Sequence, residues 1–75
     1  IVSRGHQTAE GDWFDQEWHE WVVVLRGAAR LQFTDGRLVE LNTGDFLKIA
    51  AHQRHRVAWT AEDRDTVWLA VHFRP

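Results

Sequence analysis

The sequence has no cysteine, a single serine and no long apolar run, and each absence removes a class of protein. Without cysteine the chain can form neither a disulfide framework nor a thiolate metal site, and it has no cysteine nucleophile. Ser3 is the only serine, which excludes a serine hydrolase. The longest apolar run, Trp21 to Leu25, is much shorter than the about 20 residues that a membrane span requires. Glycine-rich phosphate loops and zinc-finger spacings are absent as well.

An excess of one charge is also missing, because nine Lys and Arg stand against eleven Asp and Glu, for a formal net charge of −2. The two signs are mixed along the chain, so we expect no nucleic-acid-binding patch and no membrane partner. Apolar residues make up 44% and charged residues 27%, which is typical of a folded protein. A chain of 75 residues allows one domain with a small core. We therefore expect a soluble, cytoplasmic protein that oligomerisation would help to stabilise.

From Trp18 onward, runs rich in Val, Leu, Phe and Trp alternate with turn signals, a pattern typical of short strands. These runs predict strands at residues 21–25, 30–34, 37–41, 46–49, 55–60 and 66–73. Asp35-Gly36 predicts a hairpin with a type I′ turn. Because no crossover helix separates the strands, the pattern favours an all-β antiparallel sandwich or small barrel with little or no helix.

Residues 1–17 are the least regular part of the sequence, with scattered glycines and charges. We interpret them as an N-terminal arm or irregular strand that precedes a β domain at residues 18–75. The chain opens at Ile1 rather than Met, which is consistent with a truncated arm.

Glu20 is the first residue whose position suggests chemistry. Alternation places it on the same strand face as Val22 and Val24, which should face the core. A buried carboxylate needs a partner, and a metal ion, a histidine or an arginine would each serve. His55 begins another strand with apolar neighbours on its face, so it is either such a partner or a core histidine bonded to a backbone carbonyl.

The spacing of these residues resembles that of a small single-domain cupin over nearly the whole chain. Glu20 and Gly27 keep the interval that ends the first cupin motif, and Gly44-Asp45 opens the second. In the second motif His52 stands at a glycine position and His55 at the histidine position. The resemblance implies a small antiparallel jelly-roll barrel whose pocket holds a divalent metal ion (zinc, manganese, iron or nickel) on inward side chains.

The chain departs from the family pattern at the metal site. Cupins with a complete site carry His-x-His three or four residues before the motif's glutamate. The matching positions here hold Phe14 and Gln16 or, in the neighbouring register, Trp13 and Asp15. The resemblance therefore supplies two metal ligands, and a third must come from elsewhere.

We expect Glu20 and His55 to be metal ligands and a third ligand to come from residues 15–19. Asp15 ranks first because a carboxylate can bind the metal. His19 ranks second because it faces away from Glu20 unless a bulge intervenes. Three further residues are expected to line a substrate pocket for a small-molecule ligand: Gln16, Trp59 and His72.

Two other histidines carry less information. His72 shares a strand face with Trp68 and Ala70, and the sequence leaves open whether that face is the pocket or the surface. His52 occupies a turn position that needs a permissive backbone, so we interpret it as structural.

Aromatic residues are crowded in the arm and just after it. Five Trp and four Phe make up 12% of the chain, and core filling accounts for most of them. Trp13, Phe14 and Trp18 fit a small barrel less easily and would suit a pocket mouth or a dimer interface. We favour the interface and predict a homodimer.

Two functions remain open from the sequence. The first is a cupin that binds a divalent metal ion and a small molecule, and the fold alone does not choose among dioxygenase, isomerase, lyase and simple binding activities. The second is a metal-free ligand-binding or dimerisation module in which Glu20 is a structural carboxylate paired with arginine or histidine.

Overall fold

The computed structural model describes all 75 residues and consists of strands, turns and irregular segments. The strands are β1 (Val2–Ser3), β2 (His19–Arg26), β3 (Ala28–Phe33), β4 (Leu38–Asn42), β5 (Phe46–Ile49), β6 (His55–Thr60) and β7 (Thr66–Phe73). The last six correspond to the predicted strands within a few residues, and β1 is an additional short strand in the arm. No helix that could cross a bilayer is present.

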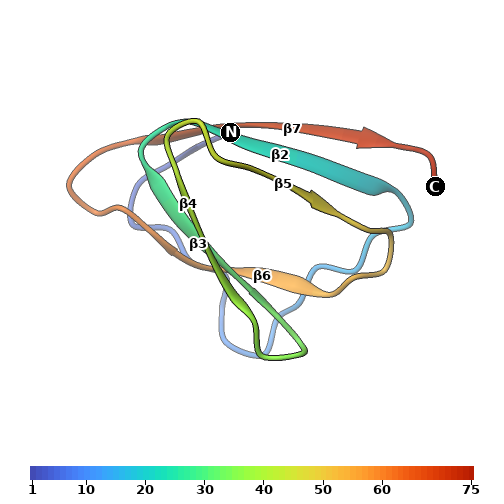
Figure 1. Cartoon of the computed structure of the whole chain (residues 1–75). Helices are drawn as coiled ribbons and strands as arrows, with labels where there is room; N and C mark the ends of the chain where they lie inside the picture. Colours follow the sequence, from blue (N-terminus) through green and yellow to red (C-terminus); the bar gives the residue numbers. More distant parts are fainter.

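The strands form two antiparallel sheets. The four-stranded sheet has the order β1-β7-β2-β5, and the three-stranded sheet has the order β4-β3-β6. Figure 1 shows β2, β5 and β7 along one side of the molecule and β6 along the other. The predicted all-β jelly-roll without helix is confirmed, although the two sheets are not closed into a continuous barrel.

Alternation along the strands builds the core between the sheets. The residues that point inward are buried and apolar, and the largest cluster comprises Val22, Val24, Ala29, Leu31, Phe33, Leu41, Ile49 and Trp68. Because successive side chains of a strand point to opposite faces, the neighbours of these residues point outward. The core therefore consists of the inward residues of β2, β3, β4, β5 and β7.

The outer faces of the two sheets differ. On the four-stranded sheet Trp21 is paired with Val71, and Val23 with Leu69, so this face is apolar. Phe46 on the same face is 65% exposed. On the three-stranded sheet, charged and amide side chains are joined to one another instead, as in the 3.0 Å contact between Arg30 Nε and Glu40 Oε1.

The Asp35-Gly36 hairpin is present, but its turn is not the predicted type I′. A type I′ turn requires positive φ at both central residues, and only Gly36 has it here, at 94°. Phe33 N–H donates to the Arg37 carbonyl at 2.9 Å, and Gly36 N–H donates to the Phe33 carbonyl at 3.0 Å. Residues 34–36 thus form a longer loop in which a left-handed glycine follows an ordinary turn, so Asp35 keeps a negative φ.

The corner between β2 and β3 is built on Gly27, whose φ is 100°. A Cβ at this position would lie 2.7 Å from Thr66 Cα, so only glycine fits without a shift of the backbone. The pairing of β2 with β7 changes register just before the corner, between Val24 and Arg26. This bulge and the glycine together carry the chain from one sheet to the other.

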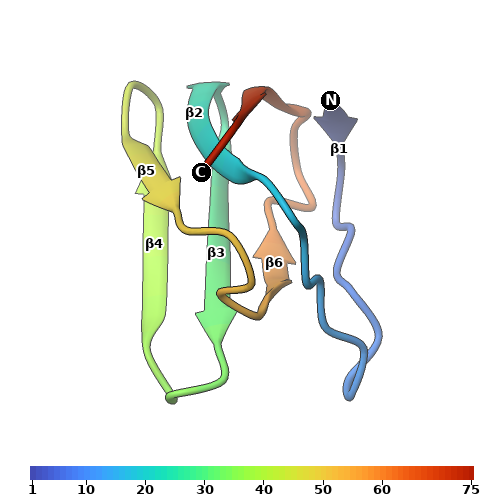
Figure 2. The same cartoon turned by 90° about the vertical axis from the view of Figure 1, so that its right-hand side faces the viewer.

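The N-terminal arm runs beside β6 and extends the three-stranded sheet (Figure 2). Thr8 N–H donates to the Val57 carbonyl at 2.8 Å, and Phe14 forms an isolated antiparallel bridge with His55. These bonds place the segment around Phe14 and Gln16 over the edge of the space between the sheets.

Candidate functional site

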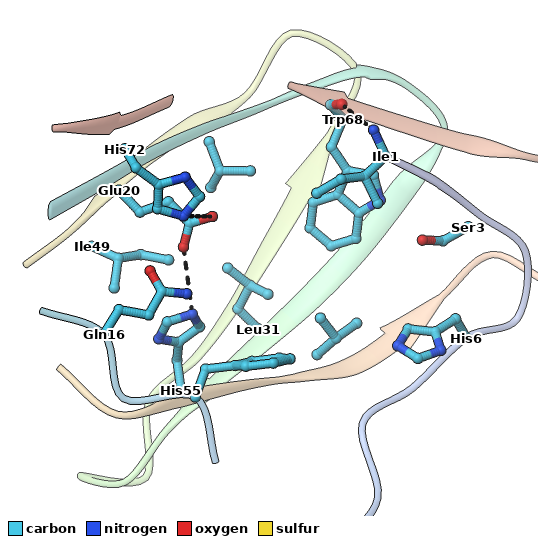
Figure 3. A pocket seen from close by; sticks show the side chains of 13 residues that line it. Ile1, Ser3, His6, Gln16, Glu20, Leu31, Ile49, His55, Trp68 and His72 are labelled. Carbon is cyan, nitrogen blue, oxygen red and sulfur yellow. Dashed lines mark hydrogen bonds and ion pairs between the residues drawn. The ribbon is translucent and has the colours of Figure 1, made fainter. Parts of the chain in front are cut away.

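A cavity of about 290 Å³ lies between the sheets, and Figure 3 shows the side chains that line it. Seven of its 13 lining residues are hydrophobic. The polar lining residues are Ser3, His6, Gln16, Glu20, His55 and His72. No lysine or arginine is among them, and Glu20 is the only acidic residue in the lining.

Glu20 reaches the cavity because β2 pairs it with His72 of β7 and Ile49 of β5, and all three residues face inward. Its side chain is only 12% exposed. Oε1 lies 3.6 Å from His55 Nε2, and Oε2 lies 3.7 Å from His72 Nε2. The partners of Glu20 are therefore two histidines, and the alternative of an arginine partner is not seen.

His55 is held by the residues around it. Its side chain is 6% exposed, and its ring lies against the rings of Phe14 and Phe33, with centroids 5.7 and 6.1 Å away. Nδ1 lies 2.9 Å from the Gln53 carbonyl oxygen. A carbonyl can only accept, so Nδ1 carries the proton that it donates, and Nε2 of the neutral ring presents a lone pair to Glu20.

The contact between Glu20 and His55 is thus incomplete by itself. At 3.6 Å the Oε1 and Nε2 atoms are too far apart for a hydrogen bond, and in the neutral ring both atoms bear lone pairs. Both side chains are also largely removed from water. A positive charge between the two atoms would stabilise the pair, whether a proton on Nε2 or a metal ion.

The donor set fits a divalent metal ion in part. Zinc bonds to nitrogen and oxygen are about 2.0–2.2 Å long, so one ion can contact two atoms that are 3.6 Å apart. The bond from His55 Nδ1 to a carbonyl is the usual support of a metal-binding histidine. However, His72 approaches the opposite oxygen of Glu20, and no three His, Asp or Glu side chains are gathered so that they could hold an ion. Glu20 and His55 bring two possible donor atoms close together, and no third donor is gathered with them.

The two residues expected to supply the third ligand lie outside the cavity. Asp15 Oδ1 is bonded to His52 Nδ1 at 2.7 Å on the surface. His19 Nδ1 accepts the Ala51 N–H at 2.9 Å, and its ring packs beside Phe73. The reason is alternation: Gln16 and Glu20 face inward, so Asp15 and His19 face outward, and no bulge separates His19 from Glu20.

Of the three predicted pocket residues, Gln16 and His72 line the cavity and Trp59 does not. The pairing of β3 with β6 changes register between Arg30 and Leu31, which leaves Ala58 as an extra residue. This bulge turns Trp59 to the outer face, where the Arg30 guanidinium lies 4.7 Å from the centre of its ring.

Three lining residues with polar side-chain atoms were not predicted: Ser3, His6 and Trp68. Trp68 is 6% exposed, and its Nε1 is a buried polar atom without a hydrogen-bond partner. An unmade hydrogen bond of this kind costs about 1–3 kcal/mol. Its strand parity with His72 was the available signal, whereas nothing in the pattern around Ser3 and His6 pointed to a pocket.

His52 has a positive φ of 60°, alone among the non-glycine residues, which confirms its structural role in the turn. Its backbone N–H donates to the Gln16 carbonyl at 2.8 Å. The turn therefore positions the segment that carries Gln16 into the cavity.

The aromatic residues that are crowded in and just after the arm are only partly buried. Phe14 is 45% exposed at the cavity, and Trp18 is 44% exposed with the Arg74 guanidinium 5.7 Å from its ring centre. The homodimer remains a prediction.

An all-β jelly-roll with a glutamate and histidines facing one apolar cavity defines a recognisable class of protein. The family model described as Cupin domain matches residues 4–72, nearly the whole chain. The chain belongs to the cupin family. No curated protein matches it in sequence.

Solved structures agree with this assignment. The structure of a proposed mannose-6-phosphate isomerase from Ralstonia eutropha JMP134 is 40% identical with a TM-score of 0.94, covering 99% of this chain and 69% of that one. A cupin protein from Bacteroides fragilis has a TM-score of 0.74 at 22% identity, covering 97% of this chain and 59% of its own. A DUF861 family protein from Thermotoga maritima has a TM-score of 0.77 at 14% identity, covering 97% and 75%. The last two likenesses concern the fold alone.

Proposed function

We propose that this cupin domain binds a small molecule in the cavity between its sheets, together with a divalent metal ion for which Glu20 and His55 are the first two ligands. The observation that supports the proposal is that Glu20 Oε1 and His55 Nε2 face each other 3.6 Å apart on two largely buried side chains. Such a pair favours a cation between the atoms, because neither atom has another partner there.

The surroundings of the pair are suited to this role. The Gln53 carbonyl holds the His55 ring in the tautomer that leaves Nε2 free, and Phe14 and Phe33 limit the rotation of the ring. His72 is 50% exposed at the cavity mouth, so its ring can turn toward the same point and supply a third ligand. A metal ion held there would act as a Lewis acid on a bound oxygen.

A metal-free version of the same site is the second candidate. It is favoured by the absence of three converging ligands and by Phe14 and Gln16, which line the cavity where complete cupin sites carry histidines. In this version a proton on His55 Nε2 supplies the positive charge, and the Glu20 cluster binds the polar group of the ligand directly.

The lining residues also bear on the class of ligand. The Ralstonia eutropha relative is described as a proposed mannose-6-phosphate isomerase. A phosphate group usually requires lysine or arginine, and this cavity has neither but contains a carboxylate. We therefore propose an uncharged small molecule rather than a sugar phosphate as the ligand of this chain.

Metal analysis with a matched pair of variants tests the proposal. Protein prepared without a histidine tag is titrated calorimetrically with zinc, manganese, iron and nickel ions, and its metal content is measured. Glu20→Gln should weaken binding at least tenfold, about 1.4 kcal/mol. The control Glu40→Gln removes an exposed carboxylate on the outer face and should bind metal like the parent.

Chelation gives a second reading of the same site. Metal that binds only the folded state raises the melting temperature by mass action, so chelator should lower it in the parent and not in Glu20→Gln. If the parent takes up none of the four ions and melts identically with chelator, the metal-free candidate replaces the metal-binding one.

A further inference from the structure

The cavity has two polar ends. The carboxylate end consists of Gln16, Glu20, His55 and His72, and the indole end consists of Ser3, His6 and Trp68. Figure 3 shows the two groups at opposite sides of the pocket. The lining also contains apolar side chains, and Figure 3 shows Leu31 between the two groups.

The indole end contains a donor without an acceptor. Trp68 is more than nine-tenths buried and lines the cavity, yet its Nε1–H has no hydrogen-bond partner. Buried indole N–H groups normally find a partner, so an exception of this kind requires an explanation. The neighbouring wall contributes the Ser3 hydroxyl, on a residue that is 8% exposed. In Figure 3 that hydroxyl points into the cavity.

The indole group restricts what can bind beside it. An indole N–H only donates, so the matching ligand atom must be an acceptor such as a carbonyl, ether or hydroxyl oxygen. The lining side chains include no lysine or arginine to balance a carboxylate or phosphate at this end, and the Ile1 ammonium beside Trp68 already donates to the Trp68 carbonyl at 3.2 Å. The acceptor therefore belongs to an uncharged group.

We infer that the indole end is a second binding position, at which Trp68 Nε1–H donates to the carbonyl oxygen of an uncharged ligand whose apolar part crosses the middle of the cavity. The inference rests on the proposed small-molecule function, but it concerns residues that the metal proposal does not use. A ketone, ester or lactone with a compact apolar body has the required chemistry, and the Ser3 hydroxyl can donate to the same oxygen.

A pair of probes of similar shape tests this assignment. Cyclohexanone carries a carbonyl oxygen, and methylenecyclohexane replaces that oxygen with a carbon that cannot accept. Each is titrated at millimolar concentration into protein labelled with nitrogen-15, and the indole N–H signal of Trp68, assigned from its loss in Trp68→Phe, is followed by NMR. Cyclohexanone should shift this signal to saturation, and methylenecyclohexane should not.

The variants make the test specific. Trp68→Phe keeps an aromatic ring and removes the donor, so it should weaken cyclohexanone binding at least fivefold, as measured on the methyl signals of Leu31. Trp59→Phe changes a tryptophan on the outer face and should leave the affinity unchanged. If Trp68→Phe does not fold, the difference between the affinities of the two probes for the parent protein, measured on the methyl signals of Leu31, decides between the outcomes.

The outcomes separate this inference from the metal proposal. Trp68→Phe should retain metal uptake, and Glu20→Gln should retain the cyclohexanone shift at Trp68. Equal binding of cyclohexanone by the parent and Trp68→Phe, or no shift at the Trp68 indole, would overturn the inference and leave a trapped water as the partner of Nε1. Metal uptake at Glu20 would be unaffected by that result.

Discussion

The two ends of the cavity share strand β7 and differ in what their polar groups lack. At the carboxylate end, Glu20 Oε1 and His55 Nε2 face each other at 3.6 Å, a separation too long for a direct hydrogen bond. At the indole end, a buried donor on Trp68 faces no acceptor. The first arrangement favours a cation and the second favours an acceptor oxygen, so the position of each unmatched group indicates the chemistry of its partner.

The largest effect on stability is expected from His55→Ala at the carboxylate end. The ring is almost fully buried, packs against Phe14 and Phe33, and is bonded to the Gln53 carbonyl. Its loss leaves a cavity and removes the donor of the Gln53 carbonyl, which should lower the free energy of unfolding by about 2–4 kcal/mol. Urea denaturation at neutral pH measures the change. A loss below about 1 kcal/mol would mean that His55 contributes little to the packing at this end.

Histidines placed at the inward positions of the arm should strengthen metal binding at the carboxylate end. Phe14 and Gln16 both line the cavity, so Phe14→His combined with Gln16→His adds two donors near Glu20 and His55. Zinc affinity measured by calorimetry should rise at least tenfold, about 1.4 kcal/mol.

The single variant Gln16→His serves as a check on folding, because it leaves Phe14 packed against His55. It should also bind zinc more tightly than the parent. Unchanged affinity in both variants would show that this end does not direct its donors to one point.

His72→Ala is expected to be the mild counterpart of His55→Ala. His72 is half exposed and reaches Glu20 only at 3.7 Å. Partly solvated pairs contribute little, so the free energy of unfolding should fall by less than about 1 kcal/mol. The same urea experiment measures the change. A loss as large as that of His55→Ala would mean that the two histidines contribute equally to stability.

The smallest effect concerns acid stability, and it comes from outside the cavity. The Arg37 backbone N–H that donates to Asp35, together with the Arg37 side chain, lowers the pKa of Asp35 below its ordinary value of 3.8. A lowered folded-state pKa adds stability above the unfolded pKa, and this stability is lost as the pH falls through the folded pKa.

Asp35→Asn should therefore reduce stability slightly at neutral pH and lose that difference in strong acid. Urea midpoints measured at about pH 7 and about pH 2 test the sign. A difference between parent and variant that persists unchanged at the lower pH would contradict it. The change in urea midpoint for this exposed group also gives a reference value with which the acid dependence of variants in the cavity can be compared.

Strand alternation made part of the site predictable. Glu20 shares the parity of Val22 and Val24, and the motif spacing brings His55 to the same pocket, so their meeting in one cavity follows from the sequence. The fold class was predictable for the same reason, because short apolar runs and turn signals are local features.

The wrong predictions arose where a single extra residue changes which face of a strand a side chain occupies, or where the outcome depends on contacts between distant parts of the chain. The bulge at Ala58 turned Trp59 outward, and the loop at residues 34–36 replaced the predicted two-residue turn. Asp15 was placed in the site because the sequence allowed two registers for the arm, which only the bridge between Phe14 and His55 distinguishes. The unpaired Trp68 donor depends on the absence of any acceptor in space, which no local pattern encodes.

The tight corner at Gly27 affects the register in which β2 pairs with its neighbouring strands. Trp21 to Leu25 is apolar on both faces, so sliding β2 by one residue would still bury an apolar set and would release Glu20 into water. The burial of Glu20 therefore works against the native alignment. Gly27 opposes the slide, because the shifted strand would bring a side chain against Thr66, where a Cβ has no room. The residue without a side chain thus keeps the carboxylate inside, and Gly27→Ala should allow misaligned chains in which the cavity has lost its charge.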